Sequence, residues 1–363
     1  MNLVNLLLYK GTLARQPVAG TFELTARCNF SCKMCYIHNA DCDGALRARE
    51  LTARQWLEIA DQAAAAGTLV LLLTGGEPML RTDFSEIYRG CVERGFLITV
   101  NTNGTCITPE LTELFRRHPP LRLNVSLYGM SAQTYEALCG NGEMFARVTE
   151  NLRKLRSMGV SVQINFTATP LNCADIAAVK QFADEIGATL QFTAYSFPEV
   201  RTAERRKETF ERFTPTQCAA ASVEYMRLTH EGESLSSFCA DPPPGTEECK
   251  NLSDKVRCRA ARGSYWITHR GEMLPCGMLP SVSHSVCEKG FLGAWDALVS
   301  DFSRVKMPSD CVSCENYARC EVCPAICYAE NGAFDAVPTY ICQKNALYRE
   351  KLRRAAEKTR SAP

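Results

Sequence analysis

Three cysteines lie within eight residues near the amino terminus, in the stretch CNFSCKMCY that ends at Tyr36. Thiolates ligate metal ions and iron–sulfur clusters, and three of them are too many for one disulfide bond. A cubane 4Fe–4S cluster normally takes four thiolates. A loop that supplies only Cys28, Cys32 and Cys35 would leave one iron with an open coordination position, which is what a reactive metal site needs.

The alternative for this loop is a zinc knuckle, in which a fourth protein ligand closes the site. His38 and Cys42 follow the loop closely enough to be that ligand. Features further along the chain must therefore decide between an open and a closed site.

Strand and helix signals alternate along the first half of the chain, and the cysteine loop follows the first strand. Residues 21–27 alternate apolar and polar side chains, which is typical of a half-buried strand, and residues 69–73 form the apolar run of a parallel strand covered on both faces. Thr82 with Asp83, and Thr108, are the expected helix caps. The remaining signals predict helices over 52–67, 82–95, 108–118, 145–159 and 175–187 and strands over 96–101, 121–127, 160–168 and 190–195. Six strands with helices between them predict a parallel α/β sheet, either curled as a partial barrel or open and doubly wound.

Polar and glycine-rich motifs follow the second, third and fourth predicted strands. The carboxyl ends of parallel strands meet at one edge of a sheet, where α/β proteins place their ligands. Gly75 and Gly76, in TGGEP, allow the backbone to approach a ligand closely, and Glu77 can accept a hydrogen bond from an ammonium group. Asn103 in NTNG and Ser126 in NVSLYG close the next two strands. Taken singly, each polar residue is an ordinary strand-end cap.

Together, the CxxxCxxC loop and the three strand-end motifs resemble the radical S-adenosylmethionine (SAM) enzymes. The resemblance implies a partial barrel of six β/α units whose 4Fe–4S cluster chelates the amino and carboxylate groups of SAM at its open iron. It also implies reductive cleavage of SAM to a 5′-deoxyadenosyl radical, which abstracts a hydrogen atom from the substrate. The residues that it places at the cofactor are Met34, Tyr36, Gly75, Gly76, Glu77, Pro78, Asn103 and Ser126.

Two positions depart from the family pattern. Met34 stands where the family usually has an aromatic residue against the adenine, although a thioether can pack on a purine edge and Tyr36 is close by. Tyr128 stands where the fourth-strand motif usually carries an acidic residue, and we attach no role to it from the sequence.

Nine of the twenty cysteines fall between Cys258 and Cys342. Cys258, the GxxxxC step that ends at Cys276, the run CVSCENYARCEVCPAIC and Cys342 resemble the SPASM extension, an auxiliary-cluster domain of radical SAM enzymes that modify peptides and proteins. The resemblance implies two auxiliary 4Fe–4S clusters. One would be held by Cys311, Cys314, Cys320 and Cys342, and the other by Cys258, Cys276 and either Cys323 or its rival Cys327.

The auxiliary ligands leave several alternatives open. Ser264 stands in the region where a further ligand often lies, so the cluster of Cys258 would recruit Cys239 or Cys249, or keep an open iron. Spacing alone also allows a zinc ribbon. Its ligands would be Cys311, Cys314, Cys320 and Cys323. Cys287 fits neither pattern, and small buried hydrophobic roles are expected for the single cysteines Cys91, Cys106, Cys139, Cys173 and Cys218.

The composition of the whole chain indicates a globular protein whose positive and negative charges nearly balance, so that it has no strong electrostatic field. Its 363 residues include 41 Lys and Arg against 40 Asp and Glu, so nothing draws in nucleic acid or an anionic membrane. The apolar start lacks the basic region and cleavage site of a signal peptide and is too short to span a bilayer, so a cytoplasmic protein is expected.

The turn-rich stretch DPPPGTEE indicates a domain junction. The expected parts are an N-terminal extension (1–19), a radical SAM core (20–200), a linker with a helix (201–256), a SPASM domain (257–345) and an exposed basic C-terminal helix (346–363).

The resemblance implies an enzyme that acts on a peptide or protein side chain, with thioether or carbon–carbon cross-linking of a ribosomal peptide as the leading reaction. Flavodoxin or ferredoxin would be its reductant. Oxidation of the sulfatase-maturase type is an alternative, although Gly277 stands where those enzymes carry an acidic base. A small-molecule substrate of the tetrapyrrole type is another. A non-catalytic iron–sulfur electron carrier would explain the cysteines but not the strand-end motifs.

Overall fold

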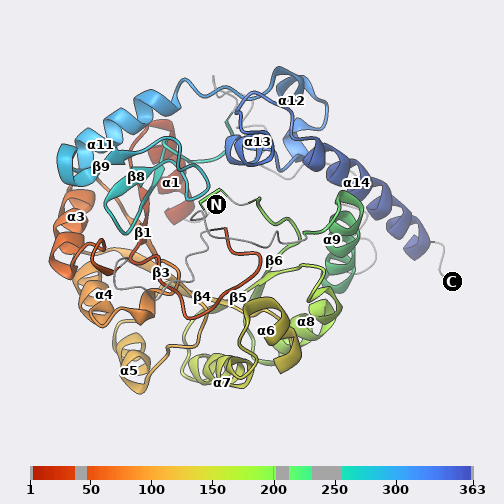
Figure 1. Ribbon diagram of the computed structural model, residues 1–363, viewed down its shortest axis with the longest axis horizontal. Helices are drawn as coiled ribbons and strands as arrows, with labels where there is room; N and C mark the ends of the chain where they lie inside the picture. The colour runs from red at the N-terminus through yellow and green to blue at the C-terminus, as the bar shows by residue number, and fades with distance from the viewer. Residues whose placement is uncertain (1–2, 37–46, 199, 202–211, 231–255, 361–363) are drawn as a thin grey trace.

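The computed structural model describes residues 3–36, 47–198, 200–201, 212–230 and 256–360. Six parallel strands lie side by side in chain order: β1 (Ala19–Glu23), β2 (Val70–Thr74), β3 (Leu97–Thr102), β4 (Arg122–Ser126), β5 (Val162–Thr167) and β6 (Thr189–Thr193). Between them run α3 (Ala53–Ala65), α4 (Phe84–Glu93), α5 (Pro109–Arg117), α6 (Ala132–Cys139), α7 (Met144–Ser157) and α8 (Ile176–Glu185). These helices all lie outside the curved sheet (Figure 1). The sheet is therefore a partial barrel, because a doubly wound sheet would carry helices on both faces.

Local signals explain where several of these helices begin. Thr52 forms a capping box at the start of α3, and the side chain of Thr108 caps α5 as predicted. Asp83 is the N-cap residue of α4, as predicted, but its carboxylate makes no capping hydrogen bond and instead accepts one from Arg81 at 2.7 Å. The ion pair with this near neighbour occupies the side chain that the local signal assigned to the helix. Helix α6, which the sequence patterns missed, is capped by Ser131.

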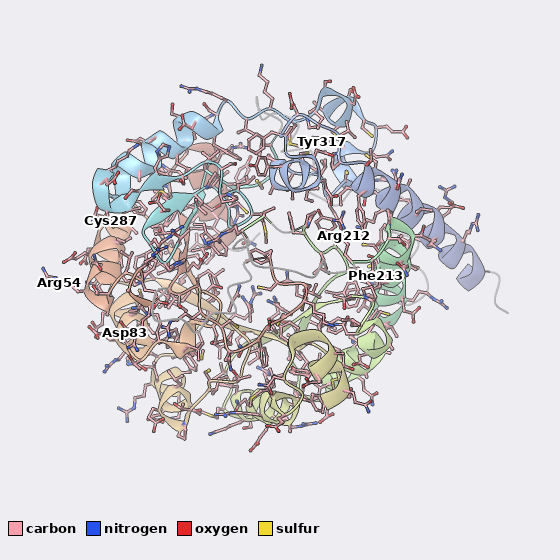
Figure 2. All side chains as sticks on the ribbon, viewed as in Figure 1. Arg54, Asp83, Arg212, Phe213, Cys287 and Tyr317 are labelled. Carbon is pink, nitrogen blue, oxygen red and sulfur yellow. The ribbon has the colours of Figure 1, made fainter. Side chains whose placement is uncertain are left out.

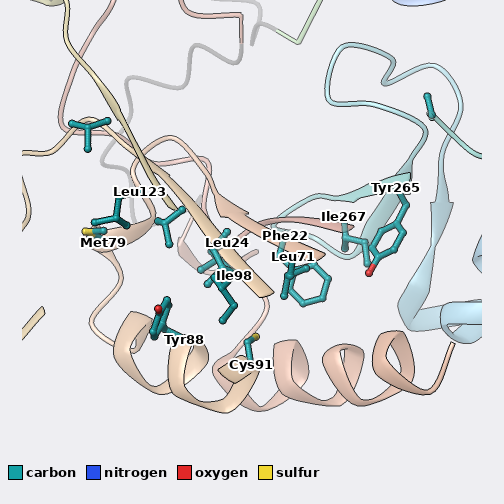
Figure 3. Close-up of a cluster of buried hydrophobic side chains, with 14 of the residues drawn as sticks. Phe22, Leu24, Leu71, Met79, Tyr88, Cys91, Ile98, Leu123, Tyr265 and Ile267 are labelled. Atoms are coloured by element: carbon teal, nitrogen blue, oxygen red, sulfur yellow. The ribbon is translucent and has the colours of Figure 1, made fainter. Parts of the chain in front are cut away.

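The main core lies between the outer face of the sheet and the helices (Figure 3). Phe22, Leu71 and Ile98 are buried there at alternate positions of neighbouring strands, and Tyr88 and Cys91 of α4 pack into the same cluster. Burial of one strand face fixes the register of every strand. The residues between these core positions must consequently face the concave side of the barrel.

The C-terminal part of the chain extends the same sheet beyond β1. Strand β7 (Ser264–Ile267) pairs parallel with β1, and β8 (Glu272–Leu274) and β9 (His284–Ser285) follow in antiparallel pairs. Helix α11 (Val286–Phe302) covers this extension and α1 (Leu3–Leu13) lies near it (Figure 1). The predicted core and SPASM parts thus share one sheet, a pairing that no local signal could announce. The boundary at residue 256 remains a prediction.

Four further helices complete the described chain: α9 (Pro215–Thr229), α12 (Ser309–Ser313), α13 (Pro324–Asn331) and α14 (Thr339–Arg360). Helix α14 packs along α9 and buries Leu352 and Lys344, whose ammonium pairs with Glu321 at 2.6 Å. The predicted basic helix is therefore not exposed on all faces, and because it begins at Thr339 it also carries Cys342. No helix among the described residues is both long and apolar enough to cross a bilayer.

Candidate functional site

The backbone of α6 holds the cysteine loop in place. We call residues 28–36 the cluster loop. The backbone N–H of Ser31 donates to the carbonyl of Cys139 at 3.1 Å, and the N–H of Lys33 donates to the carbonyl of Leu138 at 2.9 Å. The last turn of α6 thus serves as a template for the centre of the loop, immediately around Cys32.

The three thiols of the cluster loop lie close enough to affect one another's ionisation. Burial raises the pKa of Cys28 to about 12, and the charges of Cys32 and Cys35 add to that shift. The backbone N–H of Phe30 opposes it by donating to the Sγ of Cys28 at 3.4 Å. Thiols whose pKa is raised, as for Cys28 and Cys32, become thiolates more readily next to positive charge, which iron supplies. The donor set therefore fits an iron–sulfur cluster.

A single metal ion fits the described residues less well. They contain no group of three or more Cys, His, Asp and Glu side chains that could hold one ion. His38 and Cys42, the fourth ligands considered for zinc, lie outside the described residues.

Glu77 forms a buried acceptor at the carboxyl end of the sheet. Its carboxylate accepts hydrogen bonds from the hydroxyl of Thr102 at 2.9 Å, from the backbone N–H of Asn103 at 2.7 Å and from the backbone N–H of Met79 at 3.1 Å. Burial raises the pKa of Glu77 to about 7, against the effect of these donors. Within the described part of the chain no cationic side chain pairs with it. A buried carboxylate in this state is suited to an ammonium group.

Asn103 connects this acceptor to the cluster loop. Its side-chain NH2 donates to the Oδ1 of Asn29 at 2.8 Å and lies 3.7 Å from the Sγ of Cys28. The Asn29 side chain in turn donates to the hydroxyl of Thr105 at 2.8 Å. The predicted SAM residues Glu77 and Asn103 and the first predicted cluster ligand therefore meet at one point.

The two glycines of TGGEP have a packing role that the sequence interpretation did not foresee. A Cβ on Gly75 would lie 2.5 Å from the carbonyl oxygen of Thr25, and one on Gly76 would lie 2.3 Å from that of Arg27. The backbone that these glycines approach is thus the segment leading into the cluster loop. Pro78 follows as the buried first residue of a short 3-10 turn (Pro78–Leu80).

Tyr128 is a contact residue that the sequence interpretation left without a role. Burial raises the pKa of Tyr128 above its ordinary range, and the nearby side chains of Cys32 and Ser126 also influence it. Tyr128 therefore lies between the cluster loop and the end of β4, where Ser126 was predicted to contact SAM. The side chain of Cys139 lies beside the Cys32 thiol and helps to raise its pKa. The sequence contained one sign of this role, because Tyr128 stands where the family resemblance predicts an acidic residue.

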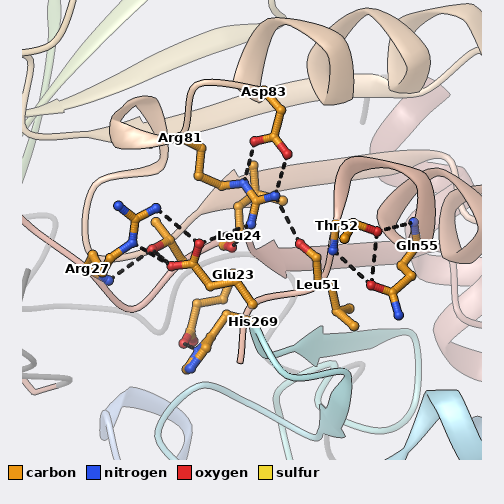
Figure 4. A network of polar contacts seen from close by, with 11 residues as sticks. Glu23, Leu24, Arg27, Leu51, Thr52, Gln55, Arg81, Asp83 and His269 are labelled. Atoms are coloured by element: carbon orange, nitrogen blue, oxygen red, sulfur yellow. Dashed lines mark hydrogen bonds and ion pairs between the residues drawn. The ribbon is translucent and has the colours of Figure 1, made fainter. Parts of the chain in front are cut away.

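A charged network supports the segment before the loop (Figure 4). Glu50 accepts hydrogen bonds from the guanidinium of Arg27 at 2.8 and 3.1 Å and pairs with Arg81 at 3.5 Å. Arg81 also donates to the carbonyls of Leu24 and Leu51, at 2.9 Å each. All three charged side chains are at most 15% exposed, so the network ties β1 and β2 together in a low-dielectric setting.

A second buried carboxylate joins the loop region to the C-terminal part. Glu23, the last residue of β1, accepts hydrogen bonds from Arg201 at 2.7 and 2.9 Å and from the indole N–H of Trp266 at 2.7 Å. His269 contacts it at 3.3 Å. Burial alone would raise the pKa of Glu23, but the hydrogen bonds and charges of His269 and Arg201 outweigh it, so the pKa lies below its usual value.

The remaining predicted SAM residues of the loop lie on either side of its third cysteine. Met34 is half-buried against the main core. Burial raises the pKa of Tyr36 above its ordinary range, with the charges of Glu23, Cys35 and Cys276 contributing. Tyr36 therefore lies between the cluster loop and the C-terminal cysteines.

The C-terminal cysteines fall into two groups. Burial raises the pKa of Cys311 to about 11, and the nearby charges of Cys342, Cys320 and Cys314 contribute. The side-chain NH2 of Asn345 donates to the Sγ of Cys320 at 3.0 Å. The four cysteines predicted for one auxiliary cluster are therefore neighbours in the structure.

Cys323 belongs to the other group. Burial raises its pKa to about 11, the backbone N–H groups of Ala325 and Ile326 oppose that shift, and the charges of Cys258 and Cys276 add to it. Its neighbours thus include Cys258 and Cys276, which were predicted for the second auxiliary cluster. Helix α13 begins directly after Cys323, so its first N–H groups face the thiol.

The other cysteines have varied surroundings. Cys327 is fully buried and feels the charges of Cys311, Cys323 and Cys320. Ser264 opens β7 and pairs with Ala19, while Cys239 and Cys249 lie outside the described residues. Among the single cysteines, Cys91, Cys139 and Cys218 are buried as predicted and Cys106 is partly so. For Cys173 the prediction is wrong, because its side chain is exposed in the loop after β5; Cys287 is exposed as well (Figure 2).

Comparison with known proteins places this geometry in context. The model of the radical SAM superfamily matches residues 22–183. The AdoMet-dependent heme synthase of Methanosarcina barkeri is 28% identical over 348 residues, which cover 89% of this chain and 95% of that protein. The mycofactocin maturase MftC of Mycobacterium tuberculosis is 26% identical over 318 residues, with 84% and 77% covered.

Solved structures share the architecture. The crystal structure of Streptococcus suis SuiB bound to S-adenosylmethionine superimposes with a TM-score of 0.70 at 20% identity and covers 91% of this chain and 78% of SuiB. SuiB bound to its precursor peptide SuiA superimposes with a TM-score of 0.66. The fold is thus an α/β radical SAM partial barrel followed by a cysteine-rich C-terminal region.

Proposed function

The chain belongs to the radical SAM superfamily, and from this premise we propose that it abstracts a hydrogen atom from a side chain of a peptide or protein. Cys28, Cys32 and Cys35 are the proposed ligands of the 4Fe–4S cluster whose fourth iron site takes SAM. When bound, the cluster and SAM supply one-electron cleavage of the sulfonium and hydrogen-atom abstraction.

The observation that carries this proposal is the junction at Asn103. One side chain contacts both the first cysteine of the cluster loop and Asn29, while its backbone N–H binds the buried Glu77 carboxylate. An amino acid bound at the open iron would therefore present its ammonium group to Glu77. Ser126 lies at the adjacent strand end, beside Tyr128. The residues orient the methionyl group and keep water from it.

The C-terminal cysteines are proposed to hold two auxiliary 4Fe–4S clusters. The proposed ligands are Cys311, Cys314, Cys320 and Cys342 for one cluster and Cys258, Cys276 and Cys323 for the other, and the charge contacts within each set support this division. These clusters would accept an electron from the product or bind the substrate. A low-potential carrier such as flavodoxin or ferredoxin is the proposed reductant, in the cytoplasm.

The similarity to MftC and to SuiB, which has been crystallised with a precursor peptide, favours a peptide substrate. A sulfatase-maturase-type reaction is less favoured, because the site of its acidic base is Gly277. A Cβ there would meet the ring of Trp266 at 3.0 Å, so a longer side chain would not fit without rearrangement.

A tetrapyrrole substrate is the second candidate. It is supported by the heme synthase of M. barkeri, which matches this chain over 95% of its own length. Titration with hemin, followed by its Soret absorption, tests whether an iron porphyrin binds.

The proposal is tested by anaerobic reconstitution and reduction with dithionite. The wild-type protein is expected to bind about twelve irons, since each of three clusters holds four, and to release 5′-deoxyadenosine from SAM. Absence of 5′-deoxyadenosine in a sample with full iron content would contradict the proposed reaction. Fewer than about eight irons would contradict the assignment of three clusters.

A further inference from the structure

The concave face of strands β3–β6 is lined by uncharged polar side chains. Leu123, Val125, Ile164 and Phe166 are buried toward the outer helices, so alternation directs their neighbours inward. By this alternation the inward residues are Thr99, Asn101, Asn124, Ser126, Gln163, Asn165, Thr167, Thr189, Gln191 and Thr193, together with one cation, Arg122, and one apolar residue, Leu97. The interior of a closed barrel is filled by bulky apolar side chains. An amide-lined interior is therefore built for a polar occupant.

The register arranges these side chains in rows across the strands. Asn101, Asn124 and Gln163 are paired neighbours in one row. Ser126, Asn165 and Gln191 are paired neighbours in the next row, toward the carboxyl edge. Ser126 is a proposed SAM contact, so the two amide side chains in its row, Asn165 and Gln191, follow it directly across the sheet. A group bound to those amides would lie next to the reacting part of SAM.

Some side-chain NH2 groups in these rows have no hydrogen-bond partner in the described chain. The side-chain NH2 of Asn124 donates to the Oδ1 of Asn101 at 2.7 Å. The NH2 of Gln163 donates to the Oδ1 of Asn165 at 2.9 Å and to the Oε1 of Gln191. In these contacts Asn165 and Gln191 act only as acceptors, and within the described chain their own NH2 groups have no partner. Each NH2 offers two N–H donors, and the Gln191 side chain is exposed to the concave face.

The charges nearby match a peptide better than a tetrapyrrole. Arg122 lies one row further from the carboxyl edge and donates to Asn124 at 2.8 Å, while Arg201 is paired with Glu23. A porphyrin with several carboxylates would need a flat apolar slot and several cations. A peptide backbone offers alternating carbonyl acceptors and N–H donors, which primary amides complement.

We propose that Asn165 and Gln191 bind the backbone of an extended segment of the substrate peptide. Their NH2 groups donate to its carbonyl oxygens, and the segment runs along the concave face of β5 and β6 so that the side chain to be modified faces Ser126. Neighbouring strands lie about 4.8 Å apart, which puts both amides within reach of one extended segment. This inference rests on the proposed function and names the part of the site that recognises the substrate.

Selection from an mRNA-displayed library of random 15-residue peptides, on the reconstituted wild-type enzyme with SAM, supplies the probe. The enriched peptides are then measured against the Asn165→Ala/Gln191→Ala double variant and against Gln181→Ala, a matched control that removes an exposed amide from the outer helix α8. Loss of two backbone hydrogen bonds is expected to weaken peptide binding about tenfold in the double variant and to leave the control unchanged.

Iron content and circular dichroism check that the double variant is folded. If it loses iron, the single variant Gln191→Ala, at an exposed position on the edge strand β6, is expected to bind the peptides about threefold more weakly. The inference is overturned if no peptide is enriched, if the folded variants bind the peptides as tightly as wild type, or if hemin binds in their place. Release of 5′-deoxyadenosine without substrate reports on the proposed function independently of these outcomes.

Discussion

The two cysteine regions of this protein are held by different means. The cluster loop is fixed from several directions: α6 binds its centre, Asn103 binds its start, and a buried network of Arg27, Glu50 and Arg81 supports the preceding segment. Three of the C-terminal cysteines, Cys311, Cys314 and Cys320, lie on or beside very short elements, namely α12 with five residues and a 3-10 turn with three. The first region is shaped by the barrel, whereas the second depends on its own ligands for its shape.

The largest expected difference concerns activity. Cys28→Ala removes a proposed ligand of the SAM-binding cluster and is expected to abolish 5′-deoxyadenosine release. Cys311→Ala, in the other region, is expected to lose about four irons yet still cleave SAM, because that cluster does not bind the cofactor. Product release measured by chromatography, beside iron analysis, compares the two. Cleavage of SAM by Cys28→Ala would show that the two regions have been assigned the wrong way round.

Removal of iron should separate the regions structurally. After chelation under oxidising conditions, residues 257–345 are expected to become the first site of limited proteolysis, because much of the fold around the auxiliary cysteines comes from metal binding. The barrel over 20–198 should persist as a protected fragment, identified by mass spectrometry. Early cleavage inside the barrel would contradict the contrast between the regions.

The network beneath the cluster loop is expected to carry stability. Glu50→Ala leaves the largely buried Arg27 without its carboxylate, while Arg81 keeps its pair with Asp83, and should lower the free energy of unfolding by about 3 kcal/mol. Glu58→Ala, which breaks the exposed pair with Arg54 on α3 (Figure 2), is the matched control and should leave the thermal midpoint unchanged. Equal thermal midpoints for both variants would show that this network does not fix the cluster loop.

Affinity for SAM should depend on the first region alone. Glu77→Gln removes the proposed acceptor of the SAM ammonium and is expected to weaken SAM binding about tenfold to hundredfold, as measured by equilibrium dialysis. Glu330→Gln changes another buried carboxylate, which pairs with Arg212 near α14 (Figure 2), and should leave SAM affinity as it is.

The pH dependence of SAM binding is the smallest effect. Burial raises the pKa of Glu77 to about 7, so lowering the pH from 8 to 6 protonates the carboxylate and removes its charge. SAM binding is expected to weaken about tenfold over this range in the wild type, since about one unit lies on each side of the pKa. In Glu77→Gln the affinity for SAM should not change in this way with pH. The same pH dependence in both proteins would show that another group is responsible for it.

Local patterns predicted the barrel well. The six strands and most of their helices follow from short-range periodicity and caps such as Thr108, and these signals operate within a few residues. The exceptions have different causes. The Asp83 carboxylate pairs with Arg81, two residues earlier, instead of making a capping hydrogen bond, whereas β7 pairs with β1, a partner distant in sequence that no local pattern indicates.

The site was predictable in its residue types but not in its connections. The cluster loop, Glu77 and Asn103 could be proposed from motif and spacing. Tyr128 lies near Cys32 and Ser126, and Glu23 accepts hydrogen bonds from Arg201 and Trp266, so both side chains join segments that no pattern relates. Side chains of this kind are positioned by the tertiary fold, so the sequence alone could not assign them a role.

Electron paramagnetic resonance of the dithionite-reduced protein, recorded with and without SAM, tests the central claim most directly. We predict that SAM shifts the signal of one reduced 4Fe–4S cluster in the wild type and that this shift is absent from Cys28→Ala. A spectrum that SAM leaves unchanged, or zinc bound at the cluster loop in place of iron, would contradict the account.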